Sequence, residues 1–396
     1  MRIGPLHHAP ALAPAAMASG SPPEPSESVT LGRLFRPEIY RLQPVASGQD
    51  EIKHQCVIDS MAWSGDGLKL MTAQWEHELR LWDVTTGQAV AELQVEDPQR
   101  RRMVRASGVA LSPDGLSAAS GAQDGAVSLW RLSDGQELKR LRHTDPETPE
   151  TVSKYYGWES VSNLAYAPAG QLLASGGYDH TVCLWDPQTG GLRHRLRDTD
   201  RNYGMAFSPD GSRLYTKPGN GLTIWNTQTG RQILHIADPD EDGGSGGNLA
   251  LSRDGSKVAA IFGDGVHVWD AQTGEQLGCR KIRGGHRAAF TPEGDHLLVG
   301  ETIHNVVHDW NLATGAVERL ELPHAGDAGG INNMGFSPDG KRLAIGLLDY
   351  SLTLWERQSD QGLRSDEPRG TIRRIGDFVL VGQVRLPVRK SSSRGG

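Results

Sequence analysis

The segment LAYAPAGQLLASGGYDHTVCLWDPQTGGLRHRL, residues 164–196, decides the fold of this chain of 396 residues. It contains stretches with the alternation, or the β-branched and apolar content, that is typical of strands. These stretches are residues 164–166, 172–175, 181–185 and 192–196. Residues that favour tight turns separate them, namely Pro-Ala-Gly, Asp-His and Thr-Gly. The segment therefore predicts a small sheet of four consecutive antiparallel strands.

The same pattern occurs seven times along the chain, which makes it an internal repeat. In each copy a glycine closes the first turn and a tryptophan follows 14 to 16 residues later. The glycines are Gly67, Gly115, Gly170, Gly211, Gly255, Gly294 and Gly340. The tryptophans are Trp82, Trp130, Trp185, Trp225, Trp269, Trp310 and Trp355. Successive glycines are 39 to 55 residues apart, which brackets the length of a propeller blade and exceeds that of leucine-rich or ankyrin repeats.

A four-stranded sheet of this size has two faces to cover, so each sheet must stack against its neighbours. Seven sheets stacked radially close into a ring. We therefore predict an all-β fold, a seven-bladed β-propeller of four-stranded antiparallel blades that spans residues 36–358. Residues 1–35, rich in Pro, Ala and Ser, are predicted to form a disordered tail. Residues 359–396 are predicted to form a partly disordered C-terminal extension.

The seventh blade needs an outer strand, because its edge would otherwise expose unpaired backbone groups. Two segments have strand character, Glu38–Val45 before the first copy and Ile372–Val384 after the last tryptophan. We favour the N-terminal segment, since its offset from the first inner strand matches the other copies.

These motifs resemble the WD-repeat (WD40) family of β-propellers over about residues 54–356. The sequences LWD at 81–83, LWD at 184–186 and VWD at 268–270 match the family signature, with LWR, IWN, DWN and LWE as variants in the other copies. The repeated SPDG and TGQ turns look most like the bacterial members of the family. The resemblance is specific for the fold and says little about function, because this fold hosts many roles.

The resemblance implies a buried hydrogen-bonded set in each blade: His before the first strand, Ser or Thr on the second, Asp in the next turn and Trp on the third. The first copy offers His54, Thr72 and Trp82, with Glu76 in place of the Asp. The second and third copies offer Ser120, Asp124 and Trp130, and Ser175, Asp179 and Trp185, which we interpret as sets without the His. The later copies keep mainly Trp225, Trp269, Trp310 and Trp355, together with Asp349. We assign all of these residues to a structural role.

Composition and motifs narrow the classes of function. The formal charge of −7 and the pI of about 6.1 give no global attraction to nucleic acid or to anionic membranes. The three cysteines have no CxxC spacing, which argues against a disulfide framework or a zinc site and favours a cytoplasmic location. No GxSxG, HExxH, phosphate-binding loop or EF-hand spacing occurs. The sequence therefore predicts no catalytic residue, no metal ligand and no cofactor.

Large aromatic residues outside the repeat pattern suggest a binding surface. The turns before the third strands and the loops before the first strands open on the same rim of the ring. Trp75, Tyr178 and Tyr350 lie in turns of the first kind, Tyr155, Tyr156 and Trp158 lie in an enlarged loop of the second kind, and Arg100, Arg101 and Arg102 flank them. Trp, Tyr and Arg are the residues enriched in binding hot spots. The alternative for each aromatic ring is that it covers the edge of its own blade.

We therefore predict a monomeric, non-catalytic scaffold that presents this rim to a protein or peptide partner. A function of another class remains open, a propeller enzyme or a small-molecule sensor that uses the central channel, where no linear motif would reveal the site.

Overall fold

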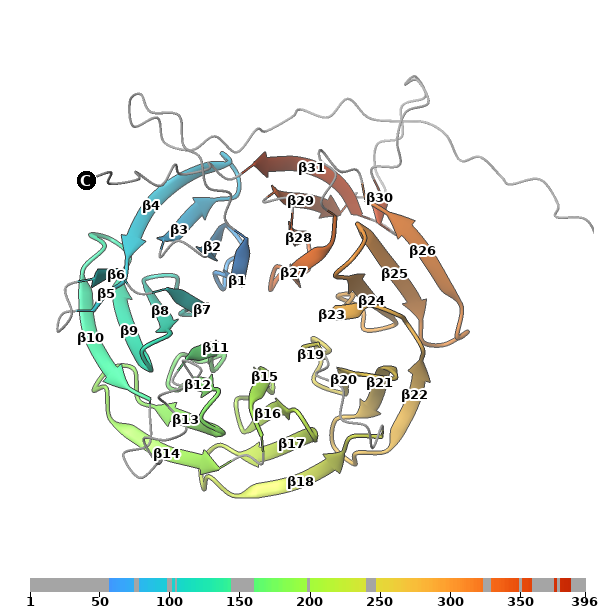
Figure 1. Ribbon diagram of the computed structural model, residues 1–396, viewed down its shortest axis with the longest axis horizontal. Coiled ribbons are helices and arrows are strands. Elements are labelled where there is room, and N and C mark those ends of the chain that lie inside the picture. The colour runs from blue at the N-terminus through green and yellow to red at the C-terminus, as the bar shows by residue number, and fades with distance from the viewer. Residues whose placement is uncertain are drawn as a thin grey trace, which may run out of the picture. The chain divides into compact units, whose positions relative to one another are not determined.

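The computed structural model describes residues 57–74, 78–97, 102–103, 105–143, 160–197, 200–239, 247–322, 329–348, 351–357, 374–375 and 378–385. Within these ranges every helix or strand assigned is a β-strand, so none of the described residues forms a helix able to cross a membrane. The strands form seven sheets around a common centre, with four antiparallel strands in each blade (Figure 1). The predicted seven-bladed β-propeller is confirmed.

The strands of each blade follow one another from the channel outward. Blade 1 contains β1 (Ile58–Trp63), β2 (Lys69–Gln74), β3 (Glu78–Asp83) and β4 (Gln88–Gln94). Blade 2 contains β7 (Ala106–Leu111), β8 (Ser117–Ala122), β9 (Ala126–Arg131) and β10 (Glu137–Arg142). Blade 3 contains β11 (Val161–Tyr166), β12 (Leu173–Gly177), β13 (Thr181–Trp185) and β14 (Leu192–Arg197). Blade 4 contains β15 (Asn202–Phe207), β16 (Arg213–Pro218), β17 (Gly221–Asn226) and β18 (Gln232–Ala237).

The remaining blades follow the same plan. Blade 5 contains β19 (Leu249–Leu251), β20 (Lys257–Phe262), β21 (Gly265–Asp270) and β22 (Gln276–Arg280). Blade 6 contains β23 (Gly285–Phe290), β24 (His296–Glu301), β25 (Val306–Asn311) and β26 (Val317–Glu321). Blade 7 contains β27 (Ile331–Phe336), β28 (Arg342–Leu347), β29 (Ser351–Arg357) and β31 (Phe378–Arg385), with the short β30 (Arg374–Ile375) at its edge. A separate two-stranded ribbon, β5 (Glu96–Asp97) and β6 (Arg102–Met103), lies between blades 1 and 2 in sequence.

In five blades, a bond from a Ser hydroxyl to an Asp carboxylate shapes the turn after the inner strand. In blade 2 the Ser112 hydroxyl donates to the Asp114 carboxylate at 2.5 Å, and the same carboxylate oxygen accepts the backbone N–H of Leu116 at 3.0 Å. Gly115 adopts a φ of +67°, which a residue with a side chain rarely tolerates. These residues therefore set the hairpin without help from the rest of the fold.

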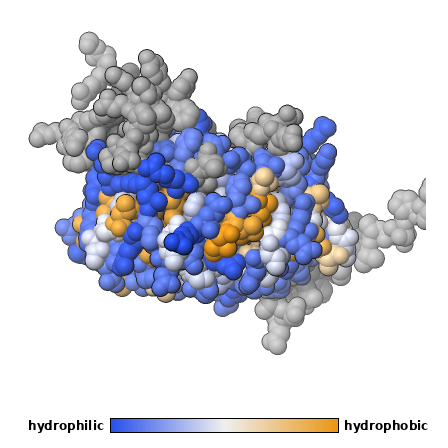
Figure 2. Space-filling view, turned by 90° about the horizontal axis from the view of Figure 1, so that it is seen from below, coloured by the Kyte–Doolittle hydropathy of each residue, from blue (hydrophilic) through white to orange (hydrophobic). Residues whose placement is uncertain are grey.

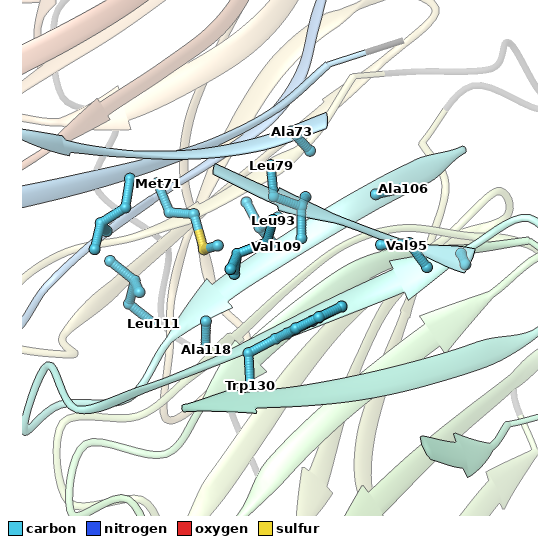
Figure 3. Close-up of a cluster of buried hydrophobic side chains, with 12 residues drawn as sticks. Met71, Ala73, Leu79, Leu93, Val95, Ala106, Val109, Leu111, Ala118 and Trp130 are labelled. Carbon is cyan, nitrogen blue, oxygen red and sulfur yellow. The ribbon is translucent and has the colours of Figure 1, made fainter. Parts of the chain in front are cut away.

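The repeated tryptophans fill the spaces between blades. Each of the seven buried apolar clusters contains one of them, packed with residues of the preceding blade. In the cluster of Figure 3, Trp130 of blade 2 lies with Met71 and Leu93 of blade 1. An isolated blade would leave these faces in water, at a cost of roughly 25 cal/mol for each Å² of apolar surface. Each blade therefore depends on its neighbours.

The outer wall of the ring is a mixed surface. It is largely polar, with separate hydrophobic patches (Figure 2). Six outer-strand residues with exposed apolar side chains are Val90, Leu138, Leu192, Ile233, Leu277 and Val317. Such residues are expected on the strand farthest from the core, because one of its faces meets solvent.

The C-terminal candidate supplies the outer strand of blade 7. Strand β31 pairs antiparallel with β29 over seven residue pairs, from Ser351 with Arg385 to Arg357 with Phe378. Our preference for the N-terminal segment Glu38–Val45, which lies outside the described residues, is wrong. Both segments have strand character, but β31 follows β29 in the chain and completes blade 7 as the fourth strand does in the other blades. Blade 7 thus extends past residue 358, the predicted end of the propeller.

The ring closes by packing of blade 7 against blade 1, and no strand among the described residues is shared between these two blades. Ile58, Leu70 and Trp82 of blade 1 share one cluster with Ala344 and Leu352 of blade 7. Polar contacts also cross this junction, among them Trp63 Nε1 to the Gly335 carbonyl at 3.0 Å and Arg342 to the Gly67 carbonyl at 3.1 Å.

Candidate functional site

The direction of the strands distinguishes the two ends of the ring. The seven inner strands all begin at one end, and the second strand of each blade returns to it. We call this end the amino rim. Turns between second and third strands lie at the amino rim, and the Ser-x-Asp-Gly turns lie at the opposite rim.

A cavity of about 610 Å³ is lined by residues at the beginnings of the inner strands, with every blade contributing. Its volume falls in the usual range for small-ligand sites, roughly 300–1,000 Å³. Turn residues of the amino rim, Gln123 and Tyr178, also line it. Polar side chains dominate the first positions of the inner strands. One step further along, the wall becomes apolar, with Met61, Val109, Leu164, Met205, Leu249 and Met334.

Much of the polar wall holds neighbouring blades together. At the same position of five inner strands, a side chain bonds to the backbone of the following blade. The contacts are Val109 N–H to Ser60 Oγ (3.2 Å), Asn163 Nδ2 to Asn202 O (2.9 Å), Ala288 N–H to Asn248 Oδ1 (2.8 Å), Arg287 Nε to Asn332 O (2.6 Å) and Asn333 Nδ2 to Asp59 O (3.3 Å). These inter-blade bonds give the channel wall a structural role. A ligand that binds in the channel would therefore contact residues that also hold the blades together.

Blades 2 and 4 carry glycine at this position, Gly108 and Gly204, because the next blade approaches too closely for a side chain. A Cβ on Gly108 would lie 2.7 Å from the Ser162 carbonyl oxygen, and one on Gly204 would lie 3.0 Å from the backbone nitrogen of Leu249.

We expect Gly108→Ala to lower the free energy of unfolding by about 2 kcal/mol, since backbone of blade 3 must shift. Gly335→Ala is the matched control, because no atom lies within 4 Å of the added Cβ and the other blades carry Ala there. It should leave stability unchanged or raise it by about 0.5 kcal/mol through the unfolded state. Urea denaturation of both variants measures the difference, and equal midpoints would contradict the close approach.

One ion pair lies in the cavity wall. Arg105 donates to both oxygens of Asp59, from Nε at 2.9 Å and from Nη2 at 2.7 Å. Burial raises the pKa of Asp59, and the guanidiniums of Arg105 and Arg287 oppose that shift. The bidentate geometry makes Asp59 the counter-ion of Arg105.

Arg287 of blade 6 lies in the same wall without an ion pair among the described residues. Its Nε bonds to the Asn332 carbonyl and its Nη1 lies 3.2 Å from His286 Nδ1. Burial lowers the pKa of Arg287 to about 10, so it stays charged at neutral pH. Burial and the adjacent Arg287 lower the pKa of His286 to about 4. His286 is therefore neutral, and Nδ1 is assigned as the acceptor of the Arg287 N–H.

Two tyrosines line the cavity from blades 3 and 4, Tyr178 and Tyr203. The guanidinium of Arg201 lies 5.7 Å from the centre of the Tyr178 ring. The buried amine of Lys217 lies 5.5 Å from the Tyr203 ring and 4.3 Å from the Phe262 ring. Burial lowers the pKa of Lys217 to about 8, although Asp238 and Asp200 oppose the shift. Cationic side chains thus lie against the two tyrosines of the cavity wall.

Of the residues predicted for the binding rim, the structure places Tyr178 in the cavity wall. Arg102 lies in β6, of which only the backbone is described. The other predicted residues lie outside the described residues, namely Trp75, Arg100, Arg101, Tyr155, Tyr156, Trp158 and Tyr350. The aromatic and arginine-rich rim therefore stays a prediction. Sequence reasoning missed Arg287, His286 and Tyr203. Arg287 is the only charged residue at a position where the other copies carry Ser, Gly or Asn. His286 and Tyr203 are the two ring side chains at the preceding position, where the other copies carry Asp, Ser, Gly or Asn.

The predicted hydrogen-bonded sets vary from blade to blade. In blades 1 to 4 the indole N–H donates to a hydroxyl on the second strand, in the pairs Trp82–Thr72, Trp130–Ser120, Trp185–Ser175 and Trp225–Thr216, at 2.8 to 3.0 Å. Trp355 donates to Thr353 of its own strand, and Trp269 lies in the cluster between blades 4 and 5. The indole nitrogen of Trp310 has no partner among the described residues.

Of the acidic residues predicted for these sets, Asp124 accepts a hydrogen bond from Arg140 at 2.6 Å. His54 and Asp349 lie outside the described residues.

The third blade does contain the histidine that our sequence interpretation denied it. His143 Nδ1 lies 2.8 Å from Ser175 Oγ, and its Nε2 lies 3.2 Å from Asp179 Oδ1. The long insertion between His143 and β11 moves this histidine away from its usual offset, which is why the spacing concealed it. Burial opposes a charge on His143, but the Cys183 sulfur and the Asp179 carboxylate outweigh it and raise its pKa to about 9.

Comparison with known proteins agrees with the geometry. The family model of the WD domain, G-beta repeat, matches residues 104–131 and 149–186. Human Coronin-7 is 35% identical over 105 residues, which are 26% of this chain and 11% of that protein. The periodic tryptophan protein 2 homolog of Schizosaccharomyces pombe is 37% identical over 89 residues, 22% of this chain and 10% of that protein. The small ribosomal subunit protein RACK1 of Caenorhabditis elegans is 31% identical over 85 residues, 22% of this chain and 26% of that protein.

The matched region thus covers about a tenth of the first two relatives and a quarter of the third. These relatives are eukaryotic, so they do not support the expected likeness to bacterial members. The residues that match the WD domain, G-beta repeat, lie in the second and third blades, and the same four-stranded plan forms the other five.

Proposed function

We propose that this chain is a non-catalytic, protein-interaction scaffold that binds a protein or peptide at the amino rim. The observation that carries the proposal is the cavity at this rim, to which every blade contributes and beside which Tyr178 and Tyr203 lie. A surface built from distant parts of the chain and lined by tyrosines is suited to bind a partner's side chains. The predicted rim residues Trp75, Trp158 and Arg100 to Arg102 would extend this surface.

The relatives support the same class of function. RACK1 of Caenorhabditis elegans is named as a small ribosomal subunit protein, hence a component of a larger assembly. We propose by analogy that this propeller, as a monomeric ring in the cytoplasm without a cofactor, contributes a binding surface to an assembly.

A second candidate is a small-molecule sensor that uses the central channel. The cavity volume of about 610 Å³ favours it, because flat protein-binding surfaces do not need a cavity of this size.

The test uses a random peptide library displayed on phage and selected on the full chain. Peptides bound at the amino rim should bind about tenfold more weakly to Tyr178→Ala and to the double variant Trp75→Ala, Trp158→Ala, as expected for hot-spot residues. Leu116→Ala is the control, because Leu116 is 66% exposed at the opposite rim. If selected peptides bind all variants equally, or if Leu116→Ala weakens them most, the proposed surface is wrong.

A further inference from the structure

We propose that the channel contains a binding site for a carboxylate attached to an apolar group, centred on Arg287. This inference goes beyond the proposed function, because a free carboxylate could occupy the site whether or not the amino rim binds a protein.

The first argument is the balance of charge in the cavity wall. Among the described residues that line the cavity, the acidic one is Asp59. Both carboxylate oxygens of Asp59 accept hydrogen bonds from Arg105. Arg287 makes its two hydrogen bonds to neutral groups, the Asn332 carbonyl and His286. Arg287 is half-buried and forms no ion pair among the described residues, and a bound anion would stabilise its partly desolvated charge. The wall carries one excess positive charge, which suits a monoanion.

The second argument is the supply of hydrogen-bond donors around Arg287. Its Nη2 has no hydrogen-bond partner among the described residues, and guanidinium N–H groups match the two oxygens of a carboxylate. Asn248 uses its Oδ1 to accept the backbone N–H of Ala288, so its Nδ2 remains available as a donor. Neutral His286 receives the Arg287 N–H at Nδ1 and thus carries its own N–H at Nε2. The group that fits these donors is an acceptor with negative charge.

The third argument is the apolar wall beside these donors. Leu249 and Met334 follow Asn248 and Asn333 directly in the inner strands, and Met205 lines the same cavity. Methionine side chains adapt to irregular apolar shapes. A strongly hydrated anion such as phosphate would leave these side chains against water, whereas an apolar carboxylate covers them. The ligand is therefore a carboxylate on an apolar body, which could be a free small molecule or the C-terminal residue of a peptide.

Titration calorimetry of the full chain with phenylpropionate tests the proposal. Phenylpropionate should bind about tenfold or more tightly than uncharged phenylpropionamide, because the charge-assisted bonds to Arg287 are lost with the amide. A short peptide that ends in phenylalanine should show the same preference for its free acid over its amide. Tighter binding of phenylpropionate would identify a free small molecule as the source of the carboxylate, and tighter binding of the peptide acid would identify the C-terminus of a peptide. Equal binding of acid and amide, or no binding of either acid, would overturn the proposal.

Two variants place the site. Asn248→Asp keeps an oxygen for the Ala288 N–H and adds a carboxylate beside Arg287, so it should weaken phenylpropionate about tenfold without lowering the melting temperature. Arg287→Met should weaken it similarly. Gln171→Glu is the matched control, because it adds the same charge at an exposed position in the turn after β11, at the opposite rim and outside the cavity lining. Unchanged affinity in Asn248→Asp, or an equal loss in Gln171→Glu, would contradict a site at Arg287, while the phage test of Tyr178 would stand independently.

Discussion

Ending the chain at Gly370 should unfold blade 7 and lower the stability of the whole ring. This truncation removes β31, whose ladder with β29 spans seven residue pairs. At about 1 kcal/mol for each backbone hydrogen bond, the loss is on the order of 5 kcal/mol, comparable with the total stability of many domains. Strand β29 would then become an edge with unpaired N–H and C=O groups, which favours aggregation. Blade 1 would lose a rigid neighbour as well.

Thermal denaturation and light scattering of the truncated chain measure both effects. The matched control ends at Pro387 and keeps β31 complete, so it should melt as the full chain does. If the chain that ends at Gly370 stays monomeric and melts with the control, then β31 does not complete blade 7.

The second large effect is a loss of stability at alkaline pH that depends on His143. The pKa of His143 is about 9 in the folded chain, against 6.5 for an ordinary histidine. Below pH 6.5 both states carry the proton, and the stabilising contribution is complete. Between pH 6.5 and 9 the unfolded chain releases the proton while the folded chain retains it, so stability falls as pH rises. The shift corresponds to about 3 kcal/mol, which is lost once pH exceeds 9.

Urea denaturation at a series of pH values tests this dependence. Asp179→Asn removes the carboxylate that bonds to His143 and should reduce the slope between pH 6.5 and 9, while the contribution of Cys183 to the pKa of His143 remains. Asp124→Asn is the matched control, since Asp124 pairs with Arg140 in blade 2 and should leave the slope intact.

Lys217 acts in the opposite sense, because its pKa of about 8 lies below the usual 10.5 and stability should rise with pH between those values. The difference between the full chain and Asp179→Asn isolates His143. A difference that does not change with pH would contradict the ion pair.

The sequence located the blades because their determinants are local and repeated. The hairpin of Ser112, Asp114 and Gly115 closes through neighbouring residues, so its form can be predicted from a short window. The regular spacing of tryptophans has a simple cause, since each fills one inter-blade cluster. His143 escaped prediction because an insertion changes its distance from β11, whereas its partners Ser175 and Asp179 depend only on spatial proximity.

The sequence by itself determined the number of blades, the order of their strands and the turns between them, because each rests on interactions within one repeat. The tertiary structure alone decided which chain segment completes blade 7, how inner strands bond to the next blade and which arginine of the channel forms no ion pair among the described residues. Arg287 and the carbonyl of Asn332 are 45 residues apart, and Asn333 reaches Asp59 from 274 residues away. The first contact forms when consecutive blades stack, and the second forms only when the ring closes, because closure brings blade 7 beside blade 1.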